Sequence, residues 1–337
     1  MTVNVWRLQT RTASEDKIAQ YCYDNNIVAM GWSITLKTLK EDLKLPIDIC
    51  TEILNKKRNI KDYQHFRNII ETYAIYPKNK SGKINTDSVA RLAEQFKKDD
   101  LVWMRIGGIY YIGRYTETSK YIFNSNTPEK YDSANQVTNI DWHEVGDETQ
   151  VPGAVSIALI KGSTFQRITK AGITAVSQLI YNQKVNREHY NGIVFDNTMD
   201  NFFTLISPTG CEDLLSMYLF SQLDNKRYIC IPSTSKISTE LYECVFLNPD
   251  TGETAYIQSK EYNDPKAVID ADKYAHLSGE IYFFLHKAQP KNIENYPNMH
   301  IVDSKTLYDF ATNPASRNTL PKNILHWIDF MKQYARP

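Results

Sequence analysis

The sequence has no apolar run long enough to cross a membrane and no excess of charge of either sign. Its longest apolar stretches, such as residues 281–285, have the length of a strand, whereas a membrane span needs about 18 consecutive apolar residues. Lys and Arg together number 39, as do Asp and Glu. We therefore expect no membrane partner. The neutral balance argues against a strongly basic protein that coats nucleic acid, although a local basic groove is compatible with it.

Cysteine and the common nucleotide and metal motifs are also sparse or missing. Five cysteines stand at positions 22, 50, 211, 230 and 244 without a CxxC pair, which argues against a disulfide framework or structural zinc and fits a reducing compartment. Residues 1–17 lack the apolar core of a secretion signal. No GxGxxG segment and no HxxxH pair is present. We therefore expect a cytoplasmic protein that does not hydrolyse nucleotides.

The chain is long enough for two folded domains. It has 337 residues, 42% hydrophobic and 23% charged, which is ordinary for a globular protein. Residues 1–168 combine helices with a β-rich block, in which strands at 101–106 and 109–115 flank Gly107-Gly108 and a further strand is expected at 155–160. Residues 169–337 alternate strands and helices, including a helix near 265–273. The predicted fold class is therefore α/β and α+β, with domains 1–168 and 169–337.

Three polar residues on two predicted strands form the most specific pattern. Glu243 lies on one apolar strand, and Gln258 and Lys260 lie at the end of the next, after a turn at 249–252. Because side chains alternate along a strand, Gln258 and Lys260 share a side, and a hairpin would bring Glu243 beside them. Glu212, at a predicted helix start, adds a second carboxylate. Such oxygen ligands suit Mg²⁺ or Mn²⁺, with the lysine placed to assist a water.

Each of these residues also has a purely structural interpretation. A Glu–Lys pair across neighbouring strands is often a surface ion pair worth little, and an acid at a helix start interacts favourably with the helix dipole. The order of the four residues taken together favours a nuclease centre.

This order of residues resembles the motif of the PD-(D/E)xK nuclease superfamily, in its Mrr-like branch with glutamine in place of the second acid (QxK). The matching residues are Glu212, Glu243 and Gln258-Ser259-Lys260. The resemblance covers about residues 170–337. It implies a restriction-endonuclease-like α/β sheet in which Glu243 and Gln258 bind the metal. Lys260 would be the catalytic lysine, and Glu212 would support the metal.

Two departures from that family pattern are visible. The first acid is Glu where Asp is more usual, and Glu240, Asp250 and Glu253 are neighbours that compete for its role. Glutamine at the second position weakens metal affinity, which implies slow catalysis or the need for a trigger.

The first half carries a second resemblance. An acidic turn, Asp99-Asp100, enters a predicted strand, and a hairpin with Gly107-Gly108 follows. With Trp6 and Trp32 on earlier predicted strands, this order resembles the PUA/EVE-like superfamily, whose compact β-barrel holds an aromatic pocket. The resemblance covers most of residues 1–168, with 34–76 as a helical insertion. It implies a domain that reads a modified base flipped out of a duplex, or a nucleotide in RNA.

Five rings are candidates for stacking on such a base. Core packing is the alternative role for each of them, and alternation prevents two consecutive tyrosines from facing one pocket. The candidates are Trp32, Trp103, Tyr110, Tyr111 and Trp142.

Together the two resemblances imply a metal-dependent endonuclease of the restriction or anti-phage defence type, with DNA favoured over RNA as its partner. Cutting both strands would need two centres, which a homodimer would supply. One alternative is a non-catalytic nucleic-acid or nucleotide-binding module with a decayed nuclease site. Another is a barrel that binds a small nucleotide or protein signal and thereby switches the nuclease.

Overall fold

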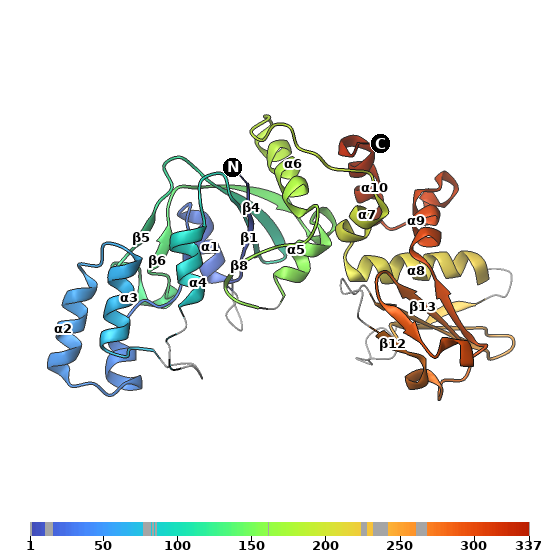
Figure 1. The fold of residues 1–337 in the computed structure, drawn as a ribbon, viewed down its shortest axis with the longest axis horizontal. Helices are drawn as coiled ribbons and strands as arrows, with labels where there is room; N and C mark the ends of the chain where they lie inside the picture. Colours follow the sequence, from blue (N-terminus) through green and yellow to red (C-terminus); the bar gives the residue numbers. More distant parts are fainter. Residues whose placement is uncertain are drawn as a thin grey trace. The chain divides into compact units, whose positions relative to one another are not determined.

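A computed structural model describes residues 2–10, 16–76, 82, 84, 86–160, 162–223, 228–231, 242–260 and 268–336, without the side chains of residues 223 and 260. The chain forms two compact units, Met1–Val151 with Val155–Ile193, and Pro152–Ala154 with Val194–Pro337. Both units mix helices and strands (Figure 1). The protein is therefore a mixed α/β protein with several sheets, as its sequence predicts.

The first unit is built on an open five-stranded sheet with the order β7-β4-β3-β1-β8. Its strands pair antiparallel except β1 with β3, which are parallel. The strand bounds are Val5–Leu8 (β1), Leu101–Ile106 (β3), Ile109–Tyr115 (β4), Ile140–Gly146 (β7) and Phe165–Arg167 (β8). A separate three-stranded sheet, in the order β2-β6-β5, comprises Val28–Met30 (β2), Tyr121–Phe123 (β5) and Asn135–Val137 (β6).

These strands do not form the barrel that the sequence predicts. Within the described part of the chain, β2, β5 and β6 pair with one another instead of joining the five-stranded sheet, so β7 and β8 remain its two edges. The hairpin of β3 and β4 at Gly107-Gly108 is confirmed, and both glycines have positive φ, at 55° and 92°.

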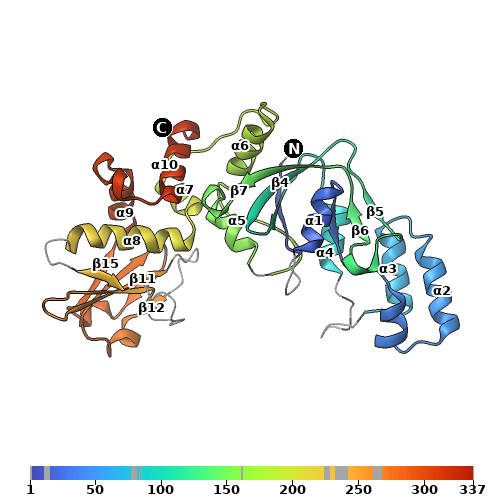
Figure 2. The ribbon, with the colours of Figure 1, turned by 180° about the vertical axis from the view of Figure 1, so that it is seen from behind.

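The predicted helical insertion is also confirmed. Residues 34–76 contain a turn of π-helix at Thr38–Asp42 and two longer helices, Ile47–Lys57 (α2) and Tyr63–Thr72 (α3). Helix α3 packs on β5 of the smaller sheet, and α2 packs on α3 (Figure 2). The other helical elements of the first unit are Lys17–Asp24 (α1), Asp87–Ala90 (α4), Ile173–Val185 (α6) and the short turns Arg91–Gln95, Glu129–Tyr131 and Glu148–Gln150. Gly153–Ala158 (α5) spans the unit boundary.

Helix α6 moves the domain boundary away from residue 168. It packs on β1, β4 and β7 of the first unit. The indole N–H of the buried Trp103 on β3 donates to Ser177 Oγ of α6 at 3.1 Å. The first unit therefore runs to Ile193, 25 residues beyond the boundary that the composition of the chain suggested.

A buried carboxylate, Asp100, ties β1 to β3. It accepts hydrogen bonds from the backbone N–H of Asn4 at 2.8 Å, the indole N–H of Trp6 at 2.8 Å and the backbone N–H of Lys97 at 3.2 Å. Burial raises the pKa of Asp100, against the opposing effect of these hydrogen bonds. The acidic turn before β3 thus has a structural role, since it fixes the parallel pairing of two strands that are far apart in sequence.

The second unit is built on a mixed sheet with the order β15-β13-β11-β10-β9. Its first three strands in the chain form an antiparallel meander, whereas β11, β13 and β15 are parallel. The bounds are Ile229–Ile231 (β9), Cys244–Leu247 (β10), Thr254–Lys260 (β11), Glu280–Leu285 (β13) and Met299–Val302 (β15).

Helices cover one face of this sheet. Pro208–Leu223 (α8) lies along it, with Met199–Leu205 (α7), Ser304–Thr312 (α9) and Lys322–Tyr334 (α10) on the same side (Figures 1 and 2). The other face carries a core that includes Ile281, Phe283 and Met299. Val268–Asp270 (β12) and Gln289–Lys291 (β14) pair with each other in a separate two-stranded sheet. The short helical turns of the unit are Ala271–Tyr274, Ile293–Asn295 and Pro314–Thr319.

Two predicted elements are wrong. The strand expected at 155–160 is largely helix α5. The helix expected near 265–273 is instead β12 and a 3-10 turn in its described part, 268–273, because Ile269 is buried in the core and the Asp270 carboxylate caps the N–H of Asp272. None of the helices in the described ranges is both long enough and apolar enough to span a membrane.

Candidate functional site

The structure brings the side chains of Glu243 and Gln258 together where β10 begins. Cys244 on β10 pairs with Ile257 on β11, and the N–H of Glu243 donates to the carbonyl of Ile257 at 2.8 Å. Residues that face each other in an antiparallel pair lie on the same side of the sheet. The amide Nε2 of Gln258 donates to Glu243 Oε1 at 2.5 Å. The predicted convergence of these two side chains is thus present in the structure.

The amide oxygen of Gln258 has no hydrogen-bond donor. The side chain is fully buried, and its Nε2 also donates to the Ser259 carbonyl at 3.3 Å. The Glu243 carboxylate and the Ser259 carbonyl are both acceptors, so the amide nitrogen of Gln258 must face them. The flipped amide would place its oxygen against theirs. Oε1 is then left buried without a partner among the described residues. Leaving such a group unpaired costs about 1–3 kcal/mol, so the position of this amide needs a physical reason beyond packing.

Lys260 ends β11, where its backbone lies opposite Leu285 of β13. Its side chain lies outside the described part of the structure. Its catalytic role therefore stays a prediction.

Glu212 reaches the same end of β10 from helix α8. Its backbone carbonyl accepts a hydrogen bond from Ser216 Oγ at 2.8 Å, and Ser216 Oγ lies 3.8 Å from Cys244 Sγ. Burial raises the pKa of Cys244 to about 12, with smaller contributions from Cys230 and Glu212. Because Cys244 and Glu243 are consecutive, their side chains leave opposite faces of the strand. Glu212 thus approaches from the face opposite to that of the Glu243–Gln258 pair.

A metal at this position would rest on one carboxylate and one amide. In the ranges that the structure describes, no three His, Cys, Asp or Glu side chains gather as a metal-binding group. Carboxylate and amide oxygens are hard ligands, and Mg²⁺ characteristically keeps several waters beside one or two protein ligands. In the present arrangement Gln258 turns Nε2 toward Glu243, so the amide must rotate before both residues offer oxygen to one ion.

The five predicted pocket rings are not gathered at one site. Trp103 faces α6, and Trp142 lies in a different part of the core, where its indole N–H donates to the Ile27 carbonyl at 3.1 Å. Tyr110 is buried, and Tyr111 packs on Tyr23 with ring centroids 4.7 Å apart. These four rings contribute to packing, which leaves Trp32.

Trp32 lines an open cavity of about 390 Å³ in the first unit. Its ring meets that of Tyr76 edge-on, with centroids 4.5 Å apart. The cavity is also lined by Gln9, Gly31, Asp132 and Thr164. Sequence reasoning missed Gln9, Tyr76 and Asp132, because they lie on three segments that only the fold brings together. The Gly31-Trp32 pair was the one local signal.

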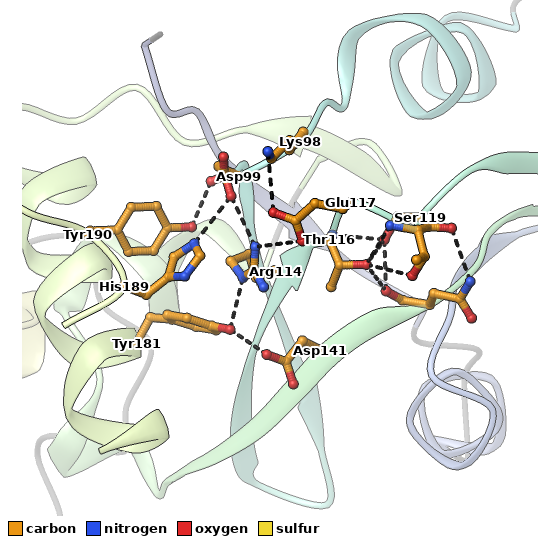
Figure 3. Close-up of polar contacts among 12 residues, drawn as sticks. Lys98, Asp99, Arg114, Thr116, Glu117, Ser119, Asp141, Tyr181, His189 and Tyr190 are labelled. Carbon is orange, nitrogen blue, oxygen red and sulfur yellow. Dashed lines mark hydrogen bonds and ion pairs between the residues drawn. The ribbon is translucent and has the colours of Figure 1, made fainter. Parts of the chain in front are cut away.

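A polar cluster joins β4 to helix α6 in the first unit. Arg114 of β4 donates to Asp99 Oδ1 through Nη1 at 3.0 Å and to the hydroxyl of Tyr181 through Nε at 3.0 Å, and Tyr181 in turn donates to Asp141 (Figure 3). His189 Nε2 lies 3.2 Å from Asp99 Oδ1. The Arg114 side chain is only 5% exposed, so it stabilises this packing and is not a surface contact for phosphate.

No family model, no curated protein and no solved structure matches this chain.

Proposed function

We propose that the second unit is a metal-dependent nuclease centre of the PD-(D/E)xK type, in its QxK form. The observation that carries this proposal is the pairing of Glu243 with Gln258, whose buried amide oxygen has no donor. A buried glutamine in a purely structural role is expected to have its oxygen satisfied as well as its nitrogen. An unsatisfied acceptor beside a carboxylate is instead an arrangement that a cation would complete.

Rotation of the terminal amide of Gln258 exchanges Nε2 and Oε1 without changing the shape of the side chain. In the present arrangement Nε2 offers its partial positive charge to Glu243. After rotation, both residues would offer oxygen to one Mg²⁺ or Mn²⁺ ion. When bound, such an ion lowers the pKa of a water and stabilises charge on a scissile phosphate.

The remaining residues would act on that water and phosphate. Glu243 would hold the ion, and Lys260 at the end of β11 would orient the water or neutralise developing charge. Glu212 on α8, which the resemblance assigns to the metal, lies on the opposite face and would support the site only indirectly. Catalysis by these residues would depend on the metal. Because Glu243 supplies a charged carboxylate and Gln258 only a neutral amide, the metal affinity should be weak.

We further propose that the first unit senses a nucleic-acid feature through the Trp32 cavity, as a PUA/EVE-like domain would. The support is an aromatic wall of Trp32 and Tyr76 around a volume of about 390 Å³, on which a planar base could stack. A nuclease that carries a nucleic-acid sensor suits a role in restriction or anti-phage defence. Its substrate would be DNA, and it would act in the cytoplasm. A homodimer would supply the second centre for double-strand cutting.

The second candidate function is a nucleic-acid or nucleotide-binding module without catalysis. It is favoured by Gln258 itself, because an amide in place of an acid is what a decayed metal site would leave. The two candidates differ in one respect, which is whether the protein breaks phosphodiester bonds when Mg²⁺ or Mn²⁺ is supplied.

The test is to incubate the protein with plasmid DNA, modified phage DNA and RNA, in Mg²⁺, in Mn²⁺ and in EDTA. We expect cleavage of a DNA substrate that requires metal and is abolished in Glu243→Ala and Lys260→Ala, with both variants folded. Tight binding without cleavage of any substrate would instead support the binding module.

A further inference from the structure

The Trp32 cavity has a carboxylate on its wall whose position is fixed by the backbone. Asp132 has φ 41°, in the left-handed region, and its Oδ1 accepts the N–H of Ser33 at 2.9 Å. Its other oxygen lies against Gly31, where an added Cβ would come within 2.7 Å of Oδ2. Glycine at position 31 thus allows the carboxylate to approach the wall. Oδ2 remains an acceptor that the described residues do not satisfy.

A second acceptor lies in the same wall. Gln9 donates through Nε2 to the carbonyl of Ile160 at 3.1 Å, and its backbone N–H donates to Thr164 at 2.7 Å. Its Oε1 is buried without a hydrogen-bond partner in the described structure. This oxygen is enclosed and does not reach the cavity, so Asp132 is the acceptor that the cavity offers to a ligand. A complementary ligand must bring a donor.

The surroundings of Asp132 favour a neutral donor over a free cation. Lys57 of α2 is close enough to interact with the charges of Glu129 and Asp132, although burial lowers the pKa of Lys57. The positive charge of this ammonium group disfavours a second cation beside Asp132. The rings of Trp32 and Tyr76 add apolar surface that suits a planar ligand.

We propose that this cavity selects planar rings that carry an exocyclic amino group, as cytosine and adenine do, and that Asp132 is its specificity-determining residue. The inference rests on the proposed function in taking nucleic acid as the source of the ring. An amino group would donate to Asp132 Oδ2. Thymine and uracil would place a carbonyl oxygen against this acceptor, which disfavours them.

The decisive variant is Asp132→Asn. It keeps an oxygen for the N–H of Ser33 and replaces the other oxygen by an amide donor of the same shape. Asparagine is at home in the left-handed region, so the variant is expected to fold. It should reverse the preference from amino-bearing rings toward carbonyl-bearing rings. A merely structural role for Asp132 would produce no such reversal.

Two further variants complete the set. Gly31→Ala should weaken binding of every ring by displacing Asp132, because its Cβ would meet the carboxylate. Asp24→Asn is the matched control, since Asp24 on α1 is exposed and does not line the cavity. It should change neither affinity nor preference.

The experiment measures binding to the full chain in EDTA by calorimetry and by shift of the melting temperature. The probes are cytidine, adenosine, uridine and thymidine, and short DNA duplexes with one unpaired cytosine or one unpaired thymine. We expect the amino-bearing probes to bind about tenfold more tightly than the others, as one hydrogen bond to a charged carboxylate allows. A stronger response to the duplex than to the nucleoside would identify DNA as the source, and the opposite order a free nucleoside.

Equal binding of all four nucleosides, no binding of any probe, or an unchanged preference in Asp132→Asn would overturn the proposal. Because binding is measured without metal, its outcome is independent of cleavage. Cleavage without base preference would remove this inference alone. Selective binding without cleavage would remove only the nuclease.

Discussion

A hydrogen bond joins the side chain of Gln258 on β11 to that of Glu243, which directly precedes β10. The same glutamine has a second polar atom that no described residue satisfies. Nε2 of the glutamine donates to the glutamate at 2.5 Å, and Oε1 is buried without a donor in the described structure. Apolar packing does not explain a fully buried amide that is satisfied on one side only. The cation proposed above would be shared with Glu243 through the rotated amide, and the first two predictions test this proposal.

Replacing Gln258 by methionine separates a structural role from a metal-binding role. The change removes the two hydrogen bonds that Nε2 donates, to Glu243 and to the Ser259 carbonyl, and also removes the unsatisfied oxygen. These effects oppose each other, so the free energy of unfolding should change by only about 1 kcal/mol. Metal-dependent cleavage should be lost. Urea unfolding and a cleavage assay on the same preparation check both parts. Full cleavage by Gln258→Met would show that the amide binds no metal.

Replacing Gln258 by glutamate places a second carboxylate beside Glu243. Without metal, repulsion between the two groups should lower the free energy of unfolding by roughly 2 kcal/mol. Mn²⁺ should restore the melting temperature of Gln258→Glu, with a larger shift than in the wild type, because two carboxylates bind a hard cation better than one. A variant that is equally stable in EDTA and in Mn²⁺ would contradict a cation site here.

Asp100 is expected to be essential for the first unit. Asp100→Ala removes the acceptor of the N–H groups of Asn4, Trp6 and Lys97. Each buried donor left without a partner costs about 1–3 kcal/mol. Because water can reach some of these N–H groups in the variant, the free energy of unfolding should fall by about 2–4 kcal/mol in total. Denaturant unfolding measures the loss. The exposed Asp24→Ala should change stability by no more than about 0.5 kcal/mol, and an equally small effect of Asp100→Ala would refute the assigned role.

The stability of the first unit should depend on pH through Asp141. Burial acts to raise the pKa of this carboxyl, but the hydrogen bond from Tyr181 and the charges of His143 and Arg114 outweigh it, and the net pKa is lowered. A carboxyl whose folded pKa is below its unfolded value, about 3.9, stabilises the fold above that pH. This stabilisation is lost as the pH falls through the folded pKa.

The stability difference between wild type and Asp141→Asn should therefore be present at neutral pH and vanish under acid conditions. Urea unfolding from about pH 7 down to about pH 3 tests this. Tyr181→Phe, which removes the hydroxyl that donates to Asp141, should raise the pH at which the stabilisation is lost. A difference that stays constant with pH would mean that Asp141 acts without its charge.

The Glu243–Gln258 contact could be predicted because local rules determine it. Side-chain alternation and a short turn fix which residues of a hairpin face each other. The turn is held by Asn248, whose Oδ1 accepts the N–H groups of Asp250 and Thr251, and by Gly252 with φ 74°. Each of these signals lies within a few residues of the site it determines.

The other elements depend on packing that no local pattern encodes. The β-branched segment after Gly153 suggested a strand, yet it forms a helix, and a side chain at Gly153 would come within 2.5 Å of the backbone of Ser207. The cavity unites Gln9, Trp32, Tyr76 and Asp132 from four separate segments. The five rings were not found in one pocket for a related reason. The fold places Trp103 against Ser177 and Trp142 against Ile27, and no local sequence pattern distinguishes these two surroundings.

The most direct test of the metal site is a calorimetric titration of Mn²⁺ into the wild-type protein and into Glu243→Gln. The account predicts one ion bound by the wild type and an affinity at least about tenfold weaker in the variant, since loss of a charged ligand costs more than 1.4 kcal/mol. Equal Mn²⁺ affinity in the two proteins, with both folded, would contradict it.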